Sequence, residues 1–289
     1  MCSCVPGPGG VVSGPRPASG RSLAAGAAAV AAATAVALLA VGARSADDAA
    51  EPGAGAAPEQ LRVRVLATLP HDTEAFTQGL EVREGVLYEG TGRVGRSWVA
   101  ATELSSGAEL ARADLPEPLF GEGITLTQDA LWQLTWRDGV AVERDPGTLA
   151  ERRTVRYDGE GWGLCHQQDS DRLVMSDGSD TLQFRDPVSF EPTGEVRVES
   201  ASGAVEDLNE LECVDGAVYA NVWHSDTILR IDPDEGRVTA EIDASGLLTA
   251  DERRAADVLN GIAFSPEHDA FLVTGKLWPH LFVVEFVPG

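Results

Sequence analysis

The stretch GVLYEGTG at residues 85–92 is the first of five variants of one strand-like unit, and this unit decides the fold. The other four are DALWQLTW at 129–136, DRLVMSDG at 171–178, GAVYANVW at 216–223 and DAFLVTGK at 269–276. Successive units lie about 44, 42, 45 and 53 residues apart. Such a period is typical of propeller blades, because one small sheet cannot cover its own apolar faces and must stack on neighbours around an axis. The repeats therefore predict an all-β, five-bladed β-propeller.

A second recurring element lies between these units. It is a turn flanked by short strands, as in TELSSGAEL at 102–110, RDPGTLAER at 144–152, RDPVSFEPTGEV at 185–196 and IDPDEGRVTAEI at 231–242. The early strand LRVRVLATL at 61–69 and the last strand LFVVEFV at 281–287 are expected to complete one blade together. This pairing would close the ring and remove the exposed edges of an open array. The last and longest spacing contains LTADERRAADVLN at 248–260, where Thr249 could cap a short helix.

The first sixty residues have a different composition. Residues 1–22 are rich in Gly, Pro and Ser with Arg16 and Arg21 as their only charges, and residues 23–43 form an uncharged run of Ala, Val and Leu. This pattern predicts a cytoplasmic tail followed by a transmembrane anchor or signal helix, and the lack of a clean Ala-x-Ala site favours the anchor over a cleaved signal peptide. Residues 44–60 have linker composition, so 61–289 is expected to be one extracytoplasmic catalytic domain, membrane-anchored or secreted.

The net charge limits the kinds of partner that the chain can bind, and the cysteine content leaves one disulfide possible. Acidic residues outnumber basic ones by 46 to 22, and the formal charge of −24 argues against nucleic acid as a partner. The only expected membrane contact is through the N-terminal segment, and the domain is expected to be monomeric. Cys165 and Cys213 could form a disulfide if the domain is exported, but the sequence does not give their separation in space, and pairing stays open.

Several familiar site patterns are missing from the sequence. It contains no G-x-S-x-G elbow, no phosphate-binding G-x-x-x-x-G-K-[ST] loop and no H-E-x-x-H helix. The five histidines show no paired metal-ligand spacing, which argues against a zinc site, and no cofactor is expected. What remains is a set of polar residues among aromatic ones at corresponding places in different repeats: Gln78, Glu89, Glu122, Asn209, Glu210, Asn221, Asn260 and Lys276. A propeller brings inner-strand ends together at the mouth of its channel, so these residues can converge.

Seven strings of the sequence resemble those of the plant and bacterial type of glutaminyl-peptide cyclotransferase, in the same order from Leu69 to Val287. They are LPHDTEAFTQGL at 69–80, YEGTGRVGRS at 88–97, FGEGITL at 120–126, GWGL at 161–164, LNELE at 208–212, ANVW at 220–223 and LNGIAFSPEHDAFLVTGKLWP at 259–279. The resemblance implies a metal-independent five-bladed propeller. It also implies the reaction, in which the N-terminal glutamine of a peptide or protein cyclises to pyroglutamate and ammonia leaves.

The same resemblance implies roles for individual residues. Glu122 takes the place of the essential glutamate, which would accept a proton from the attacking α-amine and deliver one to the departing ammonia. Lys276 and Asn209 match positions that would hydrogen-bond the amide oxygen as it becomes negative. Further pocket positions match Gln78 and an aromatic wall, which consists of Phe120, Trp136, Trp162 and Trp223. Glu210 and Glu212 are interpreted as strand-end residues, and Glu89 as a residue of a turn beside the pocket.

The sequence departs from the family pattern in two places, and two other functions are compatible with a propeller. CHQQDSD at 165–171 replaces the small residues expected after GWGL, and the insertion around Thr249 is short and charged; either could alter the rim of the pocket. A Cys165–His166 nucleophile is not favoured, because adjacent residues on a strand point to opposite faces. The main alternative function is a non-catalytic propeller that binds a peptide or a cell-envelope component. A propeller lactonase would require a bound divalent metal.

Overall fold

The computed structural model describes residues 57–289, which form 22 β-strands and one short helix. The predicted segments at 1–22 and 23–43 lie outside the described residues, as does most of the predicted linker. The first strand, β1 (Glu59–Pro70), begins two residues before the predicted domain boundary at 61. Between Ala57 and Gly289 no helix has the length and apolar character needed to cross a membrane.

Three sheets are four-stranded antiparallel meanders in chain order. The first contains β2 (Thr77–Arg83), β3 (Val86–Thr91), β4 (Trp98–Glu103) and β5 (Glu109–Asp114). The second contains β6 (Gly121–Leu126), β7 (Leu131–Thr135), β8 (Val140–Arg144) and β9 (Glu151–Arg156). The third contains β10 (Leu164–Gln167), β11 (Arg172–Met175), β12 (Thr181–Arg185) and β13 (Pro192–Arg197).

The fourth sheet has ten strands, and β1 joins its two halves. One half contains β16 (Leu208–Val214), β17 (Ala217–Val222), β18 (Thr227–Asp232) and β19 (Arg237–Asp243). The other contains β22 (His280–Pro288), β21 (Ala270–Gly275) and β20 (Leu259–Ser265). The short strand β14 (Glu199–Ser200) pairs with β19, and β15 (Gly203–Ala204) pairs with β14. Strand β1 pairs antiparallel with β22 and, through residues 59–62, parallel with β19. The predicted pairing of the early strand with the last one is confirmed.

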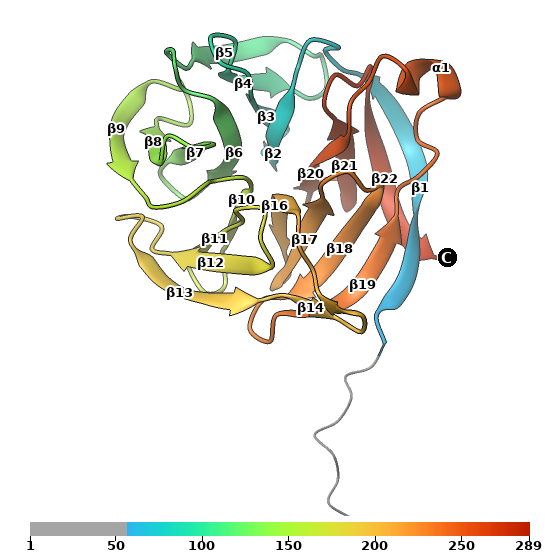
Figure 1. Cartoon of the computed structure of the whole chain (residues 1–289). Helices are drawn as coiled ribbons and strands as arrows, with labels where there is room; N and C mark the ends of the chain where they lie inside the picture. The colour runs from blue at the N-terminus through green and yellow to red at the C-terminus, as the bar shows by residue number, and fades with distance from the viewer. Residues whose placement is uncertain (1–56) are drawn as a thin grey trace, which may run out of the picture. The chain divides into compact units, whose positions relative to one another are not determined.

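The sheets surround a common centre in a propeller-like arrangement, with β2, β6, β10, β16 and β20 innermost (Figure 1). Apolar clusters join each sheet to the next around the centre. Val99 of the first sheet packs in one cluster with Ile124 of the second, and Leu80 packs with Leu272 of β21. Burial of both faces by stacking is what the repeated, strongly apolar strands require.

The recurring turn elements join the two outermost strands of a sheet. Three of them begin with an aspartate whose Oδ1 atom accepts hydrogen bonds from the backbone N–H groups two and three residues later. For Asp145 the two donors are Gly147 and Thr148, at 3.1 and 2.9 Å. Asp186 and Asp232 make the corresponding pairs of bonds. These side chains replace a backbone partner and fix the turn, which is why Asp recurs there.

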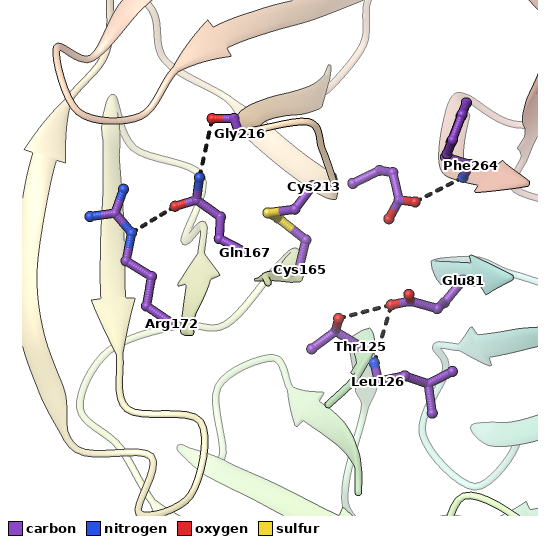
Figure 2. Close-up of a disulfide and its surroundings, with 10 residues drawn as sticks. Glu81, Thr125, Leu126, Cys165, Gln167, Arg172, Cys213, Gly216 and Phe264 are labelled. Atoms are coloured by element: carbon purple, nitrogen blue, oxygen red, sulfur yellow. Dashed lines mark hydrogen bonds between the residues drawn. A yellow bond between two sulfur atoms is a disulfide. The ribbon is translucent and has the colours of Figure 1, made fainter. Parts of the chain in front are cut away.

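Two local expectations about the chain can be compared with the structure. Helix α1 (Ala250–Arg253) starts at Thr249, whose side chain and Glu252 form a reciprocal capping box, as the sequence predicted. Cys165 and Cys213, whose pairing the sequence leaves open, form a disulfide between β10 and β16, with 5.4 Å between their Cα atoms (Figure 2). Beside it, Gln167 accepts a hydrogen bond from Arg172 and donates one to the Gly216 carbonyl (Figure 2).

Candidate active site

Four of the innermost strands carry an irregularity in register at a polar residue. The shift lies at Gln78 in β2, at Glu122 and Gly123 in β6, at Asn209 and Glu210 in β16, and at Asn260 and Gly261 in β20. A bulge of this kind bends the strand and re-aims a side chain. The same device in four strands turns polar groups toward one end of the centre of the molecule.

Glycine allows these strand ends to approach closely. A Cβ atom on Gly123 would lie 2.7 Å from both the Leu164 amide nitrogen and the Trp162 carbonyl oxygen. On Gly163 it would collide with the Asn209 carbonyl oxygen. A side chain at either position would therefore push the inner strands apart. Packing thus requires glycine at Gly123, the second Gly of FGEG, and at Gly163, the second Gly of GWGL.

A cavity of about 270 Å³ lies where these strand ends meet. All eight residues predicted for the site line it: Gln78, Phe120, Glu122, Trp136, Trp162, Asn209, Trp223 and Lys276. Three further residues that were not among the predicted site residues complete the lining: Phe76, His224 and Asp257. Residues separated by almost two hundred positions in sequence thus share one pocket, whereas their individual roles remain predictions.

A chain of side-chain amides orients Glu122. The Asn260 Nδ2 group donates to the Gln78 Oε1 atom at 3.2 Å and to the Thr77 carbonyl at 3.0 Å. Because Gln78 accepts there, its own amide N–H group faces Glu122 and donates to Oε1 at 2.8 Å. One oxygen of the Glu122 carboxyl is therefore held by the protein, and the other is free to meet a substrate.

The cavity changes the proton affinity of both of its buried charged groups. Glu122 is only 4% exposed, and this burial raises the pKa of its carboxyl well above the ordinary value. Lys276 opposes the shift, and the Glu160 carboxylate adds to it. For Lys276 itself, burial lowers the pKa, while Glu122 and Asp257 act in the opposite direction. A carboxyl that has a raised pKa can both take and release a proton near neutral pH.

The aromatic wall is fixed by a carboxylate behind it. The Oε2 atom of Glu160 accepts hydrogen bonds from the indole N–H of Trp136 at 2.8 Å and of Trp162 at 3.1 Å. Its other oxygen accepts from Arg137 at 2.8 Å. Partial burial acts to raise the pKa of Glu160, but the three hydrogen bonds outweigh it and hold the pKa below the ordinary value, so the group is ionised. One carboxylate therefore sets the orientation of two tryptophan rings.

The other rings pack edge to face along the same wall. Phe76 and Phe120 are perpendicular with centroids 6.3 Å apart, and Trp162 and Trp223 are nearly perpendicular at 5.5 Å. Lys276 Nζ lies 5.0 Å from the centre of the Phe76 ring. Such a wall holds apolar methylene groups and excludes water from the polar groups at its base.

Asn209 brings a side-chain amide to the lining of the cavity. The residue is 3% exposed, and its Oδ1 atom accepts no hydrogen bond from any residue in 57–289. An amide in a cavity wall whose hydrogen bonds the protein does not satisfy indicates a place where a ligand can form a hydrogen bond.

Of the site residues that the sequence analysis did not name, some could have been found from the sequence and others could not. Phe76 lies two positions before Gln78 in the same AFTQGL string, which could have drawn attention to it. Glu160 stands in a Gly-Glu-Gly segment like that of Glu122, which could have drawn attention to it. His224 and Asp257 lie outside regular strands, and no local pattern singles them out.

Three other carboxyl groups that the sequence analysis considered do not line the cavity. Glu89 is in β3, where it accepts hydrogen bonds from Thr77 and His71. Glu210 and Glu212 are not at a strand end as the sequence suggested; they lie inside β16, buried. The reason is that β16 continues to Val214, so its central residues face neighbouring inner strands and accept N–H groups from them.

The polar groups in the lining of the cavity are of kinds that carry protons and form hydrogen bonds. In the part of the chain that the structure describes, no three His, Cys, Asp or Glu side chains gather so that they could hold a metal ion. The polar groups at the base of the cavity are one carboxyl, one amine and two amides. This set can move a proton and hydrogen-bond an amide, which suits chemistry at an amide carbonyl.

Comparison with known proteins gives consistent matches. The profile of a family described as glutamine cyclotransferase matches residues 32–286. A glutaminyl-peptide cyclotransferase from Arabidopsis thaliana is 37% identical over 228 residues, which cover 77% of this chain and 71% of the plant protein. A crystal structure of the Myxococcus xanthus glutaminyl cyclase is 39% identical, with a TM-score of 0.71, and the match covers 80% of this chain and 98% of that one.

Proposed function

The chain belongs to the glutamine cyclotransferase family, and we propose that it acts through the cavity around Glu122, which carries the proton transfer. Its activity is that of a glutaminyl-peptide cyclotransferase, an acyltransferase that acts on peptides with N-terminal glutamine. In the reaction the α-amine nitrogen bonds to the side-chain amide carbon, and the amide nitrogen leaves as ammonia. The amine loses one proton and the leaving nitrogen gains one, so a single carboxyl can balance both steps.

The observation that carries this proposal is the protonation environment of Glu122. Its buried carboxyl has a raised pKa, and Gln78 holds one of its oxygens while the cavity leaves the other free. The free oxygen takes a proton from the α-amine as it attacks and returns it to the departing nitrogen. Because the amine and the amide belong to the same glutamine residue, holding both in one pocket supplies a large part of the rate gain.

Lys276 and Asn209 are proposed to support the same step. Lys276 lies in the lining of the cavity, buried, where its charge can stabilise the negative amide oxygen of the tetrahedral intermediate. Asn209 lies in the lining of the cavity, where its side-chain amide can hydrogen-bond the amide oxygen of the glutamine, as expected from the sequence.

We also propose that the four sheets form five blades, because the ten-stranded sheet contributes two of them. The ten-stranded sheet divides at β1 into a unit of β16–β19 and a unit of β20–β22 completed by β1. Each unit then has an innermost strand and one copy of the repeated strand-like sequence. The short parallel contact of β1 with β19 is a link between two blades under this division. An experimental structure in which β1 and β22 paired with different units would remove it.

An extracytoplasmic location is proposed from the N-terminal composition together with the disulfide. Disulfides persist mainly in oxidising compartments, which agrees with an exported domain. A reporter enzyme that is active only after export, fused after residue 60, should be active. Activity only of a reporter that requires the cytoplasm would contradict the proposal.

The activity is tested with the purified full-length protein and a short peptide that begins with glutamine, in the presence of a chelator. The product should lose the mass of one ammonia molecule, and free ammonia should appear in equal amount. The same peptide with an acetylated N-terminus is the control, because it has no nucleophilic amine and should stay unchanged. If several glutamine peptides bind and none is converted, the cavity is that of a binding protein and the proposal is wrong.

A further inference from the structure

A second cavity of about 330 Å³ adjoins the site cavity. The two share His224 and Asp257, which line both. The walls of the second cavity come from the turn that follows β17 and from the segment that leads from α1 into β20. We call it the outer groove, and nothing in the proposed reaction uses it.

The position of the outer groove matches the path that a peptide substrate has to take. The α-amine and the side-chain amide of the first residue must both reach Glu122, which is buried at the base of the site cavity. The carbonyl end of that residue then points away from the base. The second residue of the peptide must leave through the mouth, and His224 and Asp257 are the residues that connect this mouth to the outer groove.

The outer groove has an aromatic side that continues the wall of the site. The His224 ring lies against the Trp223 ring, with centroids 4.0 Å apart and planes at 33°. Trp223 is 38% exposed and contacts Trp162 inside the cavity. A side chain with a long apolar stem can therefore lie along a continuous surface from the pocket outward.

The charge in the outer groove is negative. Arg253 of α1 and Asp226 of the β17–β18 turn bind each other through two contacts of 3.2 Å, which neutralises this pair. Asp257 is exposed, and its carboxylate accepts a hydrogen bond from its neighbour Val258 at 2.7 Å. Among residues 57–289 no cation forms an ion pair with Asp257. The groove thus presents one carboxylate without an ion-pair partner beside an aromatic surface, and a cation that it influences is Lys276 in the site cavity.

Resting on the proposed function, we propose that the outer groove binds the residue that follows the N-terminal glutamine and favours lysine or arginine there. The methylene stem packs on Trp223 and His224, and the cationic head lies at Asp257. The charged insertion around Thr249, which departs from the family pattern, is then the element that sets peptide preference. A rim-exposed ion pair is weak, so the preference is modest.

The test compares the kcat/KM values of two matched peptides, Gln-Lys-Ala-amide and Gln-Glu-Ala-amide, at low ionic strength. The lysine peptide should be favoured by about three- to fivefold, the range for one exposed ion pair. In the variant Asp257→Asn this ratio should fall to near one, and in Asp129→Asn, an exposed carboxylate elsewhere, it should not change. If Asp257→Asn lowers both values equally, Asp257 acts on catalysis and the inference is overturned.

Asp226→Asn provides an independent variant, because it frees Arg253 and should shift the preference toward the glutamate peptide. Peptide binding to Glu122→Gln protein separates this inference from the proposed function. If this variant binds the lysine peptide more tightly, the groove assignment stands even where no peptide is cyclised. Equal binding of both peptides would contradict the assignment, whatever the activity.

Discussion

Glu122 depends on two neighbouring side-chain amides for its orientation. Asn260 fixes the amide of Gln78, and Gln78 in turn holds one carboxyl oxygen of Glu122. Burial then raises the pKa of that carboxyl. The combination gives a carboxyl with a defined orientation and a proton affinity suited to transfer near neutral pH.

Glu160 is expected to be a positioning residue. In Glu160→Gln, an amide NH2 group replaces one of the two carboxylate oxygens, so the hydrogen bond to Arg137 is lost and those to Trp136 and Trp162 are weakened because the acceptor is no longer charged. We expect KM to rise about five- to tenfold, as for the loss of about one ordinary hydrogen bond. The variant also removes a negative charge that raises the pKa of Glu122, so the acid limb of the kcat/KM profile should move to lower pH. Steady-state kinetics across pH measure both effects.

The matched control for this variant is Glu267→Gln, an exposed carboxyl-to-amide change outside the cavity. It should leave both KM and the pH profile unchanged. An acid limb that stays in place in Glu160→Gln would show that Glu160 has no electrostatic effect on Glu122.

At the scale of single residues, the sequence predicted those site residues that occupy corresponding positions in the repeats. The eight predicted site residues follow the repeat, since each lies at or next to the end of an inner or second strand, and all line one cavity. Asp257 and His224 could not be predicted in this way. Their place depends on how an irregular segment and a turn fold over the mouth, which no periodicity encodes.

Buried carboxylates connect the inner strands. Glu210 of β16 accepts the backbone N–H of Leu80 in β2 at 3.1 Å and of Ile262 in β20 at 2.7 Å. Glu212 accepts the N–H of Phe264, and Glu81 accepts the Thr125 hydroxyl and the Leu126 N–H (Figure 2). Inner strands of different sheets are thus joined through side chains.

These contacts predict a pH-dependent stability. Burial raises the pKa of Glu212, and Glu81 and Glu210 add to the shift. A raised pKa in the folded state means that the stabilising contribution is present at acid pH and is lost as pH rises from the unfolded-state value through the folded-state pKa. In Glu212→Gln the amide oxygen can still accept from Phe264 but cannot ionise. The variant should therefore gain at least about 1 kcal/mol in free energy of unfolding between pH 5 and pH 8, relative to the wild type.

Urea unfolding at several pH values measures this difference. The same Glu267→Gln variant serves as a control, because its carboxylate is exposed and should give a curve parallel to that of the wild type. A Glu212→Gln curve that also stays parallel to the wild type would show that Glu212 is not protonated in the folded protein.

The disulfide is expected to stabilise the contact between the third sheet and β16. It joins residues 48 positions apart, and closing such a loop restricts the unfolded chain. The double variant Cys165→Ala, Cys213→Ala should lose about 2–4 kcal/mol of unfolding free energy. Denaturant unfolding of the variant and of the wild type in reductant should give similar midpoints. A midpoint in the double variant equal to that of the oxidised wild type would contradict this.

At the element scale, strands and their partners could be predicted more readily than strand irregularities. The repeats located the second strand of each unit, and the apolar ends of the domain predicted the β1–β22 pairing. The register shifts at Gln78, Glu122, Asn209 and Asn260 have no such signal. A bulge depends on how two strands meet, so it follows from pairing rather than from the sequence of one strand.

The whole arrangement of sheets is what creates the site. Glu122 and Gln78 come from two different four-stranded sheets, whereas Asn209 and Lys276 come from the two halves of the ten-stranded one. No single sheet holds enough groups for the reaction. A repeat unit would therefore not be active alone, and activity depends on closure through β1 and β22.

The most direct test of the central claim is the turnover number of Glu122→Gln on a glutamine peptide, with Glu267→Gln as the matched control. Glutamine has the shape of glutamate and can occupy the same place beside Gln78, but it cannot carry a proton. We predict that kcat falls by at least about a hundredfold, the range for general acid–base catalysis, with little change in peptide affinity. A folded Glu122→Gln protein that turns over at the wild-type rate would contradict the account.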